Sequence, residues 1–577
     1  MSSPNNPRLF LSRICEDYVP ERDYVLGPWC FIGFEDDYPD WEKQVFLDPF
    51  QSGAEKKEAV EACANLASFL VGDLAGKLNK RHCRNYPYEY WWTLLIRWLL
   101  ILVPGLWRRW ATISNFSQKL GQEVLTTVID GRGLNAKWRF SDTERFLYRG
   151  ILDEGFDYWL LSVFVNELAP STWFLETANA KTLKYKHRFI PAPENKTNLF
   201  KRFVRGKLGH LSFNHVPGAG PLATLTLSGY IKLLNPKTVE NEFYARRCFS
   251  PPRYFPDKFL GLVNEISNLV LPSSFDENFC QFEEKASNNS YKKGRIYITG
   301  GATVLDNNNF ETAHALINGE RVVRCQHGAD YGTMNNTIHE ALPEYTGTAF
   351  LTWGWDKSDQ FTGNFIPTPS PLLSKVQNKF RKTEDRIMLV GSKTWVHTCH
   401  IDQVPEPTYA LRYRASKVEF VSELNEEVRG QLVYRPYLRG LTDLQDGQHF
   451  SKRFPEIPFF EGDLHKYMLG CGLLVIDHPG TTLHVAMAMG VPIIGFWEKN
   501  AWPISNNAKP YFDALSEVGV LHSDPKSAAS KVNEVFDHSI KWWTTPAVQV
   551  AREAWLSQFG QASRSWWIDW LRIIRKI

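Results

Sequence analysis

The chain has 577 residues, 43% of them hydrophobic and 14% aromatic, which excludes a single ordinary domain and provides for two or more packed cores. Its 66 basic residues nearly balance its 63 acidic ones, so the totals indicate neither a nucleic-acid-coating surface nor an acidic tail, and we expect no nucleic-acid partner. The 9 cysteines are scattered without a C-x-x-C pair, a pattern typical of reduced thiols rather than of a disulfide framework or a zinc site.

Residues 1–155 are predicted to be mostly helical and to form the amino-terminal part of a first lobe. The first residues lack the basic-then-apolar pattern of a secretory signal, so we expect a cytoplasmic protein. One segment, 90–107, is strongly apolar and barely long enough for a membrane span, with Arg97 near its centre and Pro104 near its end. A helix buried in the first lobe is the favoured interpretation, and contact with a membrane surface is the alternative.

Residues 156–366 are predicted to form the first of two Rossmann-type lobes. From Gly294 onward, short apolar runs separated by polar loops have the spacing of strands that alternate with helices. A Pro/Ser-rich stretch at 367–373 then predicts an extended connector. We therefore expect a domain boundary there, a second α/β lobe over residues 367–545, and closing helices over 546–577.

The segment RCQHGADYG, residues 324–332, directly follows one strand-like run of the first lobe. Its His327 is the first candidate for an acid/base group, since imidazole titrates near neutral pH, and Asp330 is the second. Taken alone, one histidine in a loop more often makes a structural hydrogen bond. Glu340 and Glu344 are expected on the next helix, as solvated or orienting groups.

The second lobe is predicted to be a doubly wound parallel sheet, because its apolar runs end repeatedly in glycine, serine, proline or charged residues. Its clearest unit is VIDHPGTTLHVAMAMGVPIIGFW, residues 475–497, which predicts a strand, a turn, a helix and a returning strand. The amides and hydroxyls of Thr481 and Thr482 would then lie at a helix amino terminus, which favours an anion. With His478 and Gly480 in the same turn, the unit predicts a phosphate site. The alternative is a plain helix cap at Thr481.

Further polar residues follow the neighbouring strands of the second lobe. Ser392 and Lys393 follow one apolar run and Arg435 follows another, and arginine can offer a bidentate fork to phosphate. Glu498 follows the returning strand and is expected near the ribose of a nucleotide. Taken singly, each of these residues is better explained as a surface charge. The strand ends of a doubly wound sheet converge on one edge, however, which favours a joint role.

The last residues, 566–577, place tryptophans and isoleucines near one helical face that is bordered by Arg572, Arg575 and Lys576. Such a helix can lie on a membrane surface. It can equally cross back and pack on the first lobe. Both expectations stay open at this point.

Several familiar catalytic motifs are absent from the sequence. It contains no G-x-x-x-x-G-K-[ST], G-x-S-x-G or H-E-x-x-H pattern, and no D-x-D element in a setting that would suggest a metal-held diphosphate. We therefore expect neither a metal nor a bound cofactor. The charge of a phosphate would instead be stabilised by the helix dipole, hydroxyls and arginine.

Together these motifs resemble a known family. The landmarks are D-H-P-G-T-T-L-H-x-A-M-A-x-G-V-P-I-I-G-F-W, LGPWC near the amino terminus, YWWTLLIRWL, QHGADYG followed by LTWGW, and WW-x(4)-VQ-x-AR near the end. They resemble a family of bacterial O-antigen and surface-polysaccharide transferases and, more distantly, the carboxyl-terminal lobe of GT-B glycosyltransferases. The resemblance implies an α/β, GT-B-like fold of two Rossmann-type lobes, with a helical amino-terminal addition and a carboxyl-terminal helix.

The resemblance also implies an activity, the transfer of a sugar from a nucleotide-sugar donor to a glycan or lipid-linked glycan acceptor of O-antigen or capsule. The His-Gly pair at His327 resembles that of cytidylyl-donor transferases, would face the space between the lobes, and suggests a CMP-linked acidic sugar such as Kdo. Arg435 and the proline that follows it occupy the positions at which related transferases carry a His-Pro pair in contact with the nucleotide. This departure leaves open which nucleobase is recognised. Peripheral contact with the inner face of the plasma membrane would suit such an acceptor. Rival interpretations are a nucleotide-sugar epimerase of the same fold and a non-catalytic, membrane-peripheral assembly scaffold.

Overall fold

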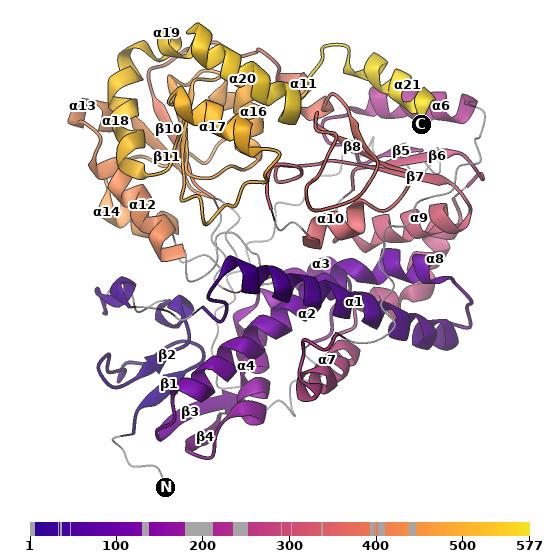
Figure 1. Cartoon of the computed structure of the whole chain (residues 1–577), viewed down its shortest axis with the longest axis vertical. Coiled ribbons are helices and arrows are strands. Elements are labelled where there is room, and N and C mark those ends of the chain that lie inside the picture. The colour runs from indigo at the N-terminus through magenta and orange to yellow at the C-terminus, as the bar shows by residue number, and fades with distance from the viewer. Residues whose placement is uncertain are drawn as a thin grey trace.

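The computed structural model describes residues 6–577 apart from several internal stretches. Not described are 33, 35–36, 45, 47, 130–137, 179–211, 235–251, 290, 302, 336–337, 393–396, 398–399, 402–409 and 438–445. The described chain forms three parallel sheets with helices packed on them, and each sheet gathers strands from one stretch of the sequence (Figure 1). The molecule therefore consists of three α/β units that follow one another along the chain.

The first unit is a four-stranded sheet in the order β2-β1-β3-β4. Its strands are β1 (Arg8–Phe10), β2 (Tyr24–Val25), β3 (Val124–Ile129) and β4 (Trp173–Ala178). Its helices are α1 (Gly53–His82), α2 (Tyr88–Lys119), α3 (Thr143–Phe146) and α4 (Glu154–Leu168), with shorter turns at Pro28–Phe31, Trp41–Lys43 and Leu147–Ile151. The sequence patterns predicted the helices but not this sheet. Because β4 pairs with β3 along its whole length, the unit runs past residue 155, where its end was expected.

The apolar segment 90–107 lies in the centre of α2 and is buried. By length and composition, α1 and α2 are apolar enough to cross a membrane, yet the whole of the most apolar window of α2 is buried inside the protein. Its arginines are paired there: Arg97 donates to the carbonyl oxygen of His339, and Arg109 contacts Asp157 at 2.6 Å. The buried-helix interpretation is therefore confirmed for this segment.

The second unit is a five-stranded sheet in the order β5-β6-β7-β8-β9. Its strands are β5 (Phe213–Asn214), β6 (Ile296–Thr299), β7 (Arg321–Cys325), β8 (Ala349–Thr352) and β9 (Phe365–Pro367). The helices of this part of the chain are α6 (Pro221–Leu233), α7 (Asp257–Leu269), α8 (Phe279–Ser287), α9 (Asp306–Ile317) and α10 (Ile338–Glu344), with a short turn at Ser273–Phe275. The central strands are buried throughout, as expected for a parallel sheet covered on both faces.

The third unit is a five-stranded parallel sheet in the order β11-β10-β12-β13-β14. Its strands are β10 (Ile387–Val390), β11 (Leu432–Arg435), β12 (Leu473–Ile476), β13 (Ile493–Phe496) and β14 (Leu521–His522). Its helices are α11 (Pro371–Val376), α12 (Ala410–Ser422), α13 (Glu426–Arg429), α14 (Asp446–Arg453), α15 (Leu464–Met468), α16 (Thr481–Met489), α17 (Lys509–Glu517), α18 (Pro525–Val535), α19 (Ser539–Trp543) and α20 (Pro546–Phe559), with a short turn at Phe536–His538. The fold class is the expected one, an α/β protein with parallel sheets, and the second and third units are its first and second Rossmann-like lobes.

The last helix, α21 (Trp566–Lys576), leaves the third unit and packs on the second, beside α6 (Figure 1). Its Trp570 and Ile574 are buried against Phe213 and neighbouring residues of the second unit. The indole N–H of Trp570 donates to the carbonyl oxygen of Pro369 at 2.8 Å. The closing helix therefore crosses back to the first lobe, while contact of its outer face with a membrane stays a prediction.

Candidate functional site

The candidate site lies where loops from the carboxyl edges of the two five-stranded sheets meet. The loop QHGADYG follows β7, and the loop HPGTT follows β12. The amide N–H of Ala329 donates to Thr481 Oγ1 at 3.0 Å. A Cβ added at Gly328 would lie 3.5 Å from the same oxygen, so the backbone passes close to it. The two motifs singled out in the sequence are thus in direct contact across the lobes.

His327 is held by a buried acid and a tyrosine. Its Nε2 lies 3.2 Å from Glu344 Oε1 and 2.8 Å from Tyr331 Oη, and Tyr331 donates to Glu344 Oε2 at 2.7 Å. Although burial alone would raise the pKa of Glu344, the neighbouring His327 and the hydrogen bond from Tyr331 hold it below its ordinary value. Glu344 is therefore an orienting carboxylate rather than a solvated one.

The geometry around His327 decides which ring nitrogen can act as a base. A carboxylate can only accept hydrogen bonds, so the contact with Glu344 favours the tautomer with its proton on Nε2. Nδ1 is then the basic nitrogen. The His327 side chain keeps 26% of its surface exposed, whereas that of Glu344 keeps 4%, so the histidine is accessible to a substrate and its partner is not.

Asp330 and Gly332 give the QHGADYG loop its shape. Both have positive φ, 79° and 74°, in the left-handed region, where aspartate is better tolerated than most residues. The carbonyl oxygen of Asp330 accepts the amides of Thr333 and Met334. A Cβ at Gly332 would lie 2.7 Å from the ring of Trp355, so only glycine fits there. The structure shows Asp330 shaping the turn, and its role as a second acid/base group stays a prediction.

Gln326 ties the loops after β7 and β8 together. Its Oε1 accepts the amide of Trp353 and the indole N–H of Trp355, both at 2.9 Å. Its Nε2 donates to the carbonyl oxygen of Gly328 at 2.9 Å. Because Gln326 is buried, these bonds fix the backbone on either side of His327. Sequence reasoning missed this residue, since an uncharged glutamine after a strand has no distinctive pattern.

The predicted strand, turn, helix and returning strand are confirmed as β12, HPGTT, α16 and β13. Gly480 is the N-cap of α16, and among the described residues no side chain caps this helix. Thr481 is the first helical residue, and its hydroxyl accepts a bond from Ala329 instead of capping its own helix. The plain-cap alternative is therefore wrong. The first N–H groups and the helix dipole suit an anion there, with Thr482 in the same turn.

His478 covers the start of α16 and is held by its neighbour Asp477. Its Nδ1 lies 2.9 Å from Asp477 Oδ1. A Cβ added at Gly480 would lie 2.7 Å from His478 Nε2, so the ring extends over this glycine. Asp477 Oδ2 accepts from Tyr413 Oη at 2.7 Å, and Tyr413 accepts the amide of Ser392 at 2.6 Å. Ser392 and His478 are thus joined by two residues that the sequence analysis did not select.

The other predicted residues of this lobe lie at neighbouring strand ends, except Lys393, which is outside the described residues. Arg435 ends β11 at the edge of the sheet and donates to the carbonyl oxygen of Phe460 at 3.1 Å, and burial lowers its pKa. Glu498 lines a small cavity with Tyr413 and Asp477, and burial raises its pKa. The structure thus brings Glu498 beside the His478 group and engages Arg435 elsewhere.

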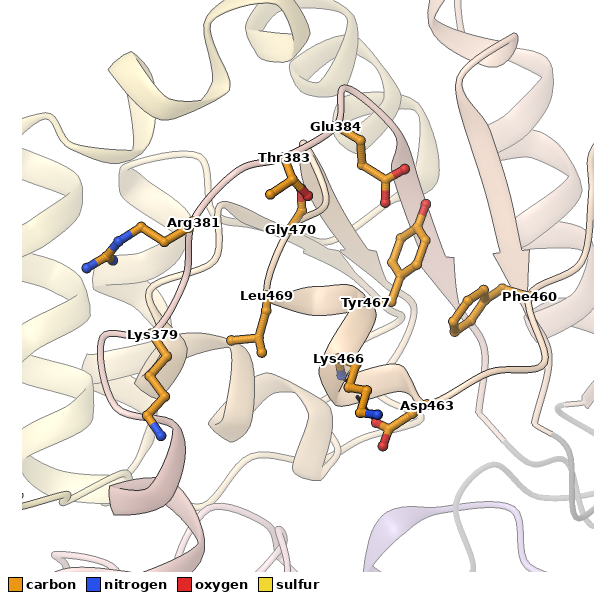
Figure 2. A pocket seen from close by; sticks show the side chains of 10 residues that line it. All are labelled: Lys379, Arg381, Thr383, Glu384, Phe460, Asp463, Lys466, Tyr467, Leu469 and Gly470. Atoms are coloured by element: carbon orange, nitrogen blue, oxygen red, sulfur yellow. Dashed lines mark hydrogen bonds between the residues drawn. The ribbon is translucent and has the colours of Figure 1, made fainter.

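A broader hollow opens on the third unit, away from these loops (Figure 2). Its lining includes Thr383, Glu384, Leu469 and Gly470, which precede β10 and β12. The hollow therefore lies at the amino ends of the strands, opposite the HPGTT loop. Because ligands of open α/β sheets bind at the carboxyl ends, we assign the candidate site to the two loops in spite of the size of this hollow.

The two lobes are also joined beside the site. The backbone N–H of Asn335 donates to the carbonyl oxygen of Pro503 at 2.8 Å. The backbone N–H of Ser505 donates to the carbonyl oxygen of Thr333 at 2.9 Å. The Ser505 hydroxyl donates to the carbonyl oxygen of Gly332 at 2.8 Å. These bonds fix the QHGADYG loop relative to the third unit.

In the part of the chain that the structure describes, no group of three or more His, Cys, Asp or Glu could hold a metal ion.

Comparison with known proteins places the chain within one family model. The model, described as LIC12162 family transferase, matches residues 8–574. No curated protein matches the chain.

Two solved structures are similar over about half of the chain. The trehalose-6-phosphate phosphatase N-terminal domain of Candida albicans aligns with 53% of this chain and 75% of its own, at 10% identity and a TM-score of 0.31. A protein of Listeria monocytogenes, named as a UDP-N-acetylglucosamine 2-epimerase, aligns with 56% and 85%, at 9% identity and a TM-score of 0.33. At these scores neither similarity carries an argument about ligand or reaction.

Proposed function

The chain belongs to the LIC12162 family of transferases, and from this we propose that it is a glycosyltransferase that moves a sugar from a nucleotide-sugar donor to a surface polysaccharide, O-antigen or capsule. The observation that carries the proposal is the 3.0 Å bond between Ala329 and Thr481. It brings a loop with a histidine base next to a helix terminus suited to phosphate. A base can take the proton of the acceptor hydroxyl, and a helix terminus can stabilise the charge on the departing phosphate.

On the acceptor side, His327 is the base of the proposed reaction. Its Nδ1 takes the proton of the attacking hydroxyl as the new glycosidic bond forms. Glu344 stabilises the imidazolium that results, because its carboxylate lies 3.2 Å from Nε2. Tyr331 keeps that carboxylate in place through its 2.7 Å hydrogen bond.

On the donor side, the phosphate lies at the amino end of α16. The N–H groups of Thr481 and Thr482 and the helix dipole receive its charge as the bond to the sugar breaks. His478 lies over the same turn. Glu498, in the loop that follows β13, is the group we place beside the ribose hydroxyls of the nucleoside. A CMP-linked acidic sugar is the donor class we propose.

The test is a panel of CMP, CDP, UDP and GDP, read by thermal shift. We expect one of them to raise the melting temperature of the unmodified chain and to raise that of Thr481→Ala less. Stabilisation by none of the four would overturn the donor assignment. Incubation with nucleotide sugars and no acceptor should give no new sugar nucleotide, because a transferase needs an acceptor. Conversion without acceptor would replace the proposal with an epimerase.

We also propose that the protein works at the cytoplasmic face of the plasma membrane, where lipid-linked acceptors are found. The neighbouring helices α6 and α21 support this, since they carry the exposed apolar side chains Leu222, Leu233 and Trp567. Exposed Lys232 and Arg572 lie on the same two helices. Co-sedimentation with phosphatidylcholine vesicles, with and without phosphatidylglycerol, tests it. We expect binding only to the anionic vesicles, weakened by Trp567→Ser. Equal binding to both, or none, would contradict it.

A further inference from the structure

Beneath the HPGTT loop lies a cluster of charged and phenolic groups that is closed off from solvent. Lys417 is 1% exposed, Asp477 2% and Asp446 5%. The lysine comes from α12, Asp446 from the start of α14, and Asp477 from the end of β12. Buried ions are costly to desolvate, and apolar replacements of such groups often leave stability unchanged or improved. A contribution to stability alone therefore does not explain why these groups are buried together.

The cluster is closely bonded. Lys417 Nζ forms a short ion pair with Asp446 Oδ2 and lies 3.2 Å from Tyr434 Oη and 3.7 Å from Asp477 Oδ2. Tyr434 donates to Asp446 Oδ2 at 2.6 Å. The lysine also lies 4.1 Å from the ring centre of Tyr413, over the aromatic face. Lys417 is therefore fixed in position by groups from several elements of the third unit.

Asp477 connects this cluster to the candidate site. One carboxylate oxygen, Oδ2, accepts from Tyr413 at 2.7 Å and lies near Lys417. The other, Oδ1, lies 2.9 Å from His478 Nδ1. Because both oxygens are engaged, rotation of the carboxylate is blocked and the orientation of the imidazole follows. Nδ1 is then the proton-bearing nitrogen of the bond to Asp477, and Nε2 lies over Gly480 at the amino end of α16.

We propose that Tyr413, Lys417 and Asp446 are positioning residues that hold Asp477 so that His478 presents Nε2 to a phosphate oxygen at the start of α16. The identity of that anion as donor phosphate rests on the proposed function. The orientation of His478 does not, because it follows from the bonds within the third unit. The two claims can therefore fail separately.

The first experiment measures the tautomer of His478 in the full chain by long-range ¹H–¹⁵N correlation with labelled histidine, assigned with His478→Gln. We expect the Nδ1-protonated form in the unmodified chain and a mixture of tautomers in Tyr413→Phe and Asp477→Ala. Tyr511→Phe is the matched control, since it removes a hydroxyl from the same lobe at a ring that packs on Phe559. An unchanged tautomer in both Tyr413→Phe and Asp477→Ala would overturn the inference.

The second experiment measures binding of inorganic phosphate by calorimetry in a double-mutant cycle. Tyr413→Phe should weaken binding about tenfold, the size of a lost hydrogen bond to a charged group, when His478 is present. It should have no further effect in a His478→Gln background, because its action passes through that ring. Equal losses in both backgrounds would indicate a merely structural role and overturn the inference, as would the absence of phosphate binding by the unmodified chain.

The outcomes also separate this inference from the proposed function. If the nucleotides fail to bind while the tautomer and phosphate responses appear, the positioning inference stands and the sugar-donor assignment falls. If transfer activity is found while Tyr413→Phe changes neither the tautomer nor phosphate affinity, the function stands and the positioning inference falls.

Discussion

The two lobes carry the same device in opposite orientation. On the second unit His327 follows β7, and on the third unit His478 follows β12, each against a buried carboxylate that also accepts from a tyrosine. The carboxylate holds Nε2 in the first case and Nδ1 in the second. In the proposed reaction Nδ1 of His327 is therefore the base, whereas Nε2 of His478 lies over a helix terminus. The nitrogen that the carboxylate engages, rather than the histidine itself, distinguishes the two roles.

The largest effect should come from His327→Ala, which removes the histidine of one lobe and leaves that of the other lobe in place. Removal of a general base lowers the rate about 10²- to 10⁴-fold. Nucleotide binding should stay unchanged, because the α16 terminus is intact. Transfer rates and thermal shifts on the same preparation check both. Loss of nucleotide binding together with activity would show instead that His327 supports the donor side.

Asp306 is a buried carboxylate that forms no ion pair with any of the described residues, and it therefore contrasts with Glu344. Asp306 accepts from the Ser274 hydroxyl at 2.6 Å and the Thr143 amide at 3.0 Å, and burial raises its pKa to about 7. The unfolded state then binds fewer protons than the native state between pH about 4 and 7, so this contribution to stability is present at low pH and lost as the pH rises.

Asp306→Asn should remove this loss, which amounts to about 4 kcal/mol across the window. Denaturant unfolding at several pH values measures it. If the free energy of unfolding of Asp306→Asn changed with pH as steeply as that of the unmodified chain, the raised pKa of Asp306 would be contradicted. For Glu344 the sign is opposite, because its pKa is lowered: its contribution is present above its ordinary pKa and is lost as the pH falls.

Glu344→Gln should lower transfer by about 10- to 100-fold, less than loss of the base itself, since the orienting group of a histidine acts through it. The pH profile should also move, because the imidazolium loses its carboxylate. Tyr331→Phe is the milder companion change, as it removes the 2.7 Å hydrogen bond to Glu344 and the 2.8 Å contact with His327 Nε2 but leaves the carboxylate in place. A rate and pH profile that both variants leave unchanged would show that the Glu344 contact has no catalytic consequence.

The smallest effect is expected on the donor side, from Gly480→Ala. The added methyl group would meet His478 Nε2 at 2.7 Å and displace the ring from the position that its bond to Asp477 gives it. Phosphate affinity should fall about tenfold, comparable to one charged hydrogen bond. Gly76→Ala is the control, because its Cβ meets nothing within 4 Å. Calorimetry measures the phosphate affinity of both variants, and equal affinities would contradict the placement of His478.

Most of the third unit and half of the site were predictable from local pattern. The run at 475–497 encodes a buried strand, a turn and a helix of small residues, and it folds as predicted because each element lies within a few residues of the next. The QHGADYG loop likewise follows a buried strand. The amino-terminal sheet was missed because β1 and β2 have only 3 and 2 residues, too few for a period to be visible.

The sequence by itself determined most helices and strands, their burial, and the two loops that carry histidines. It could do so because the spacing of apolar residues and the choice of turn residues act locally. Only the tertiary structure decided which residues complete the site. Tyr413 reaches Asp477 across 64 positions, and Ala329 reaches Thr481 across 152. It also decided that α2 is a buried helix and that α21 returns to the first lobe. Such pairings depend on strand order and lobe contact, and an apolar helix has the same pattern whether protein or lipid surrounds it.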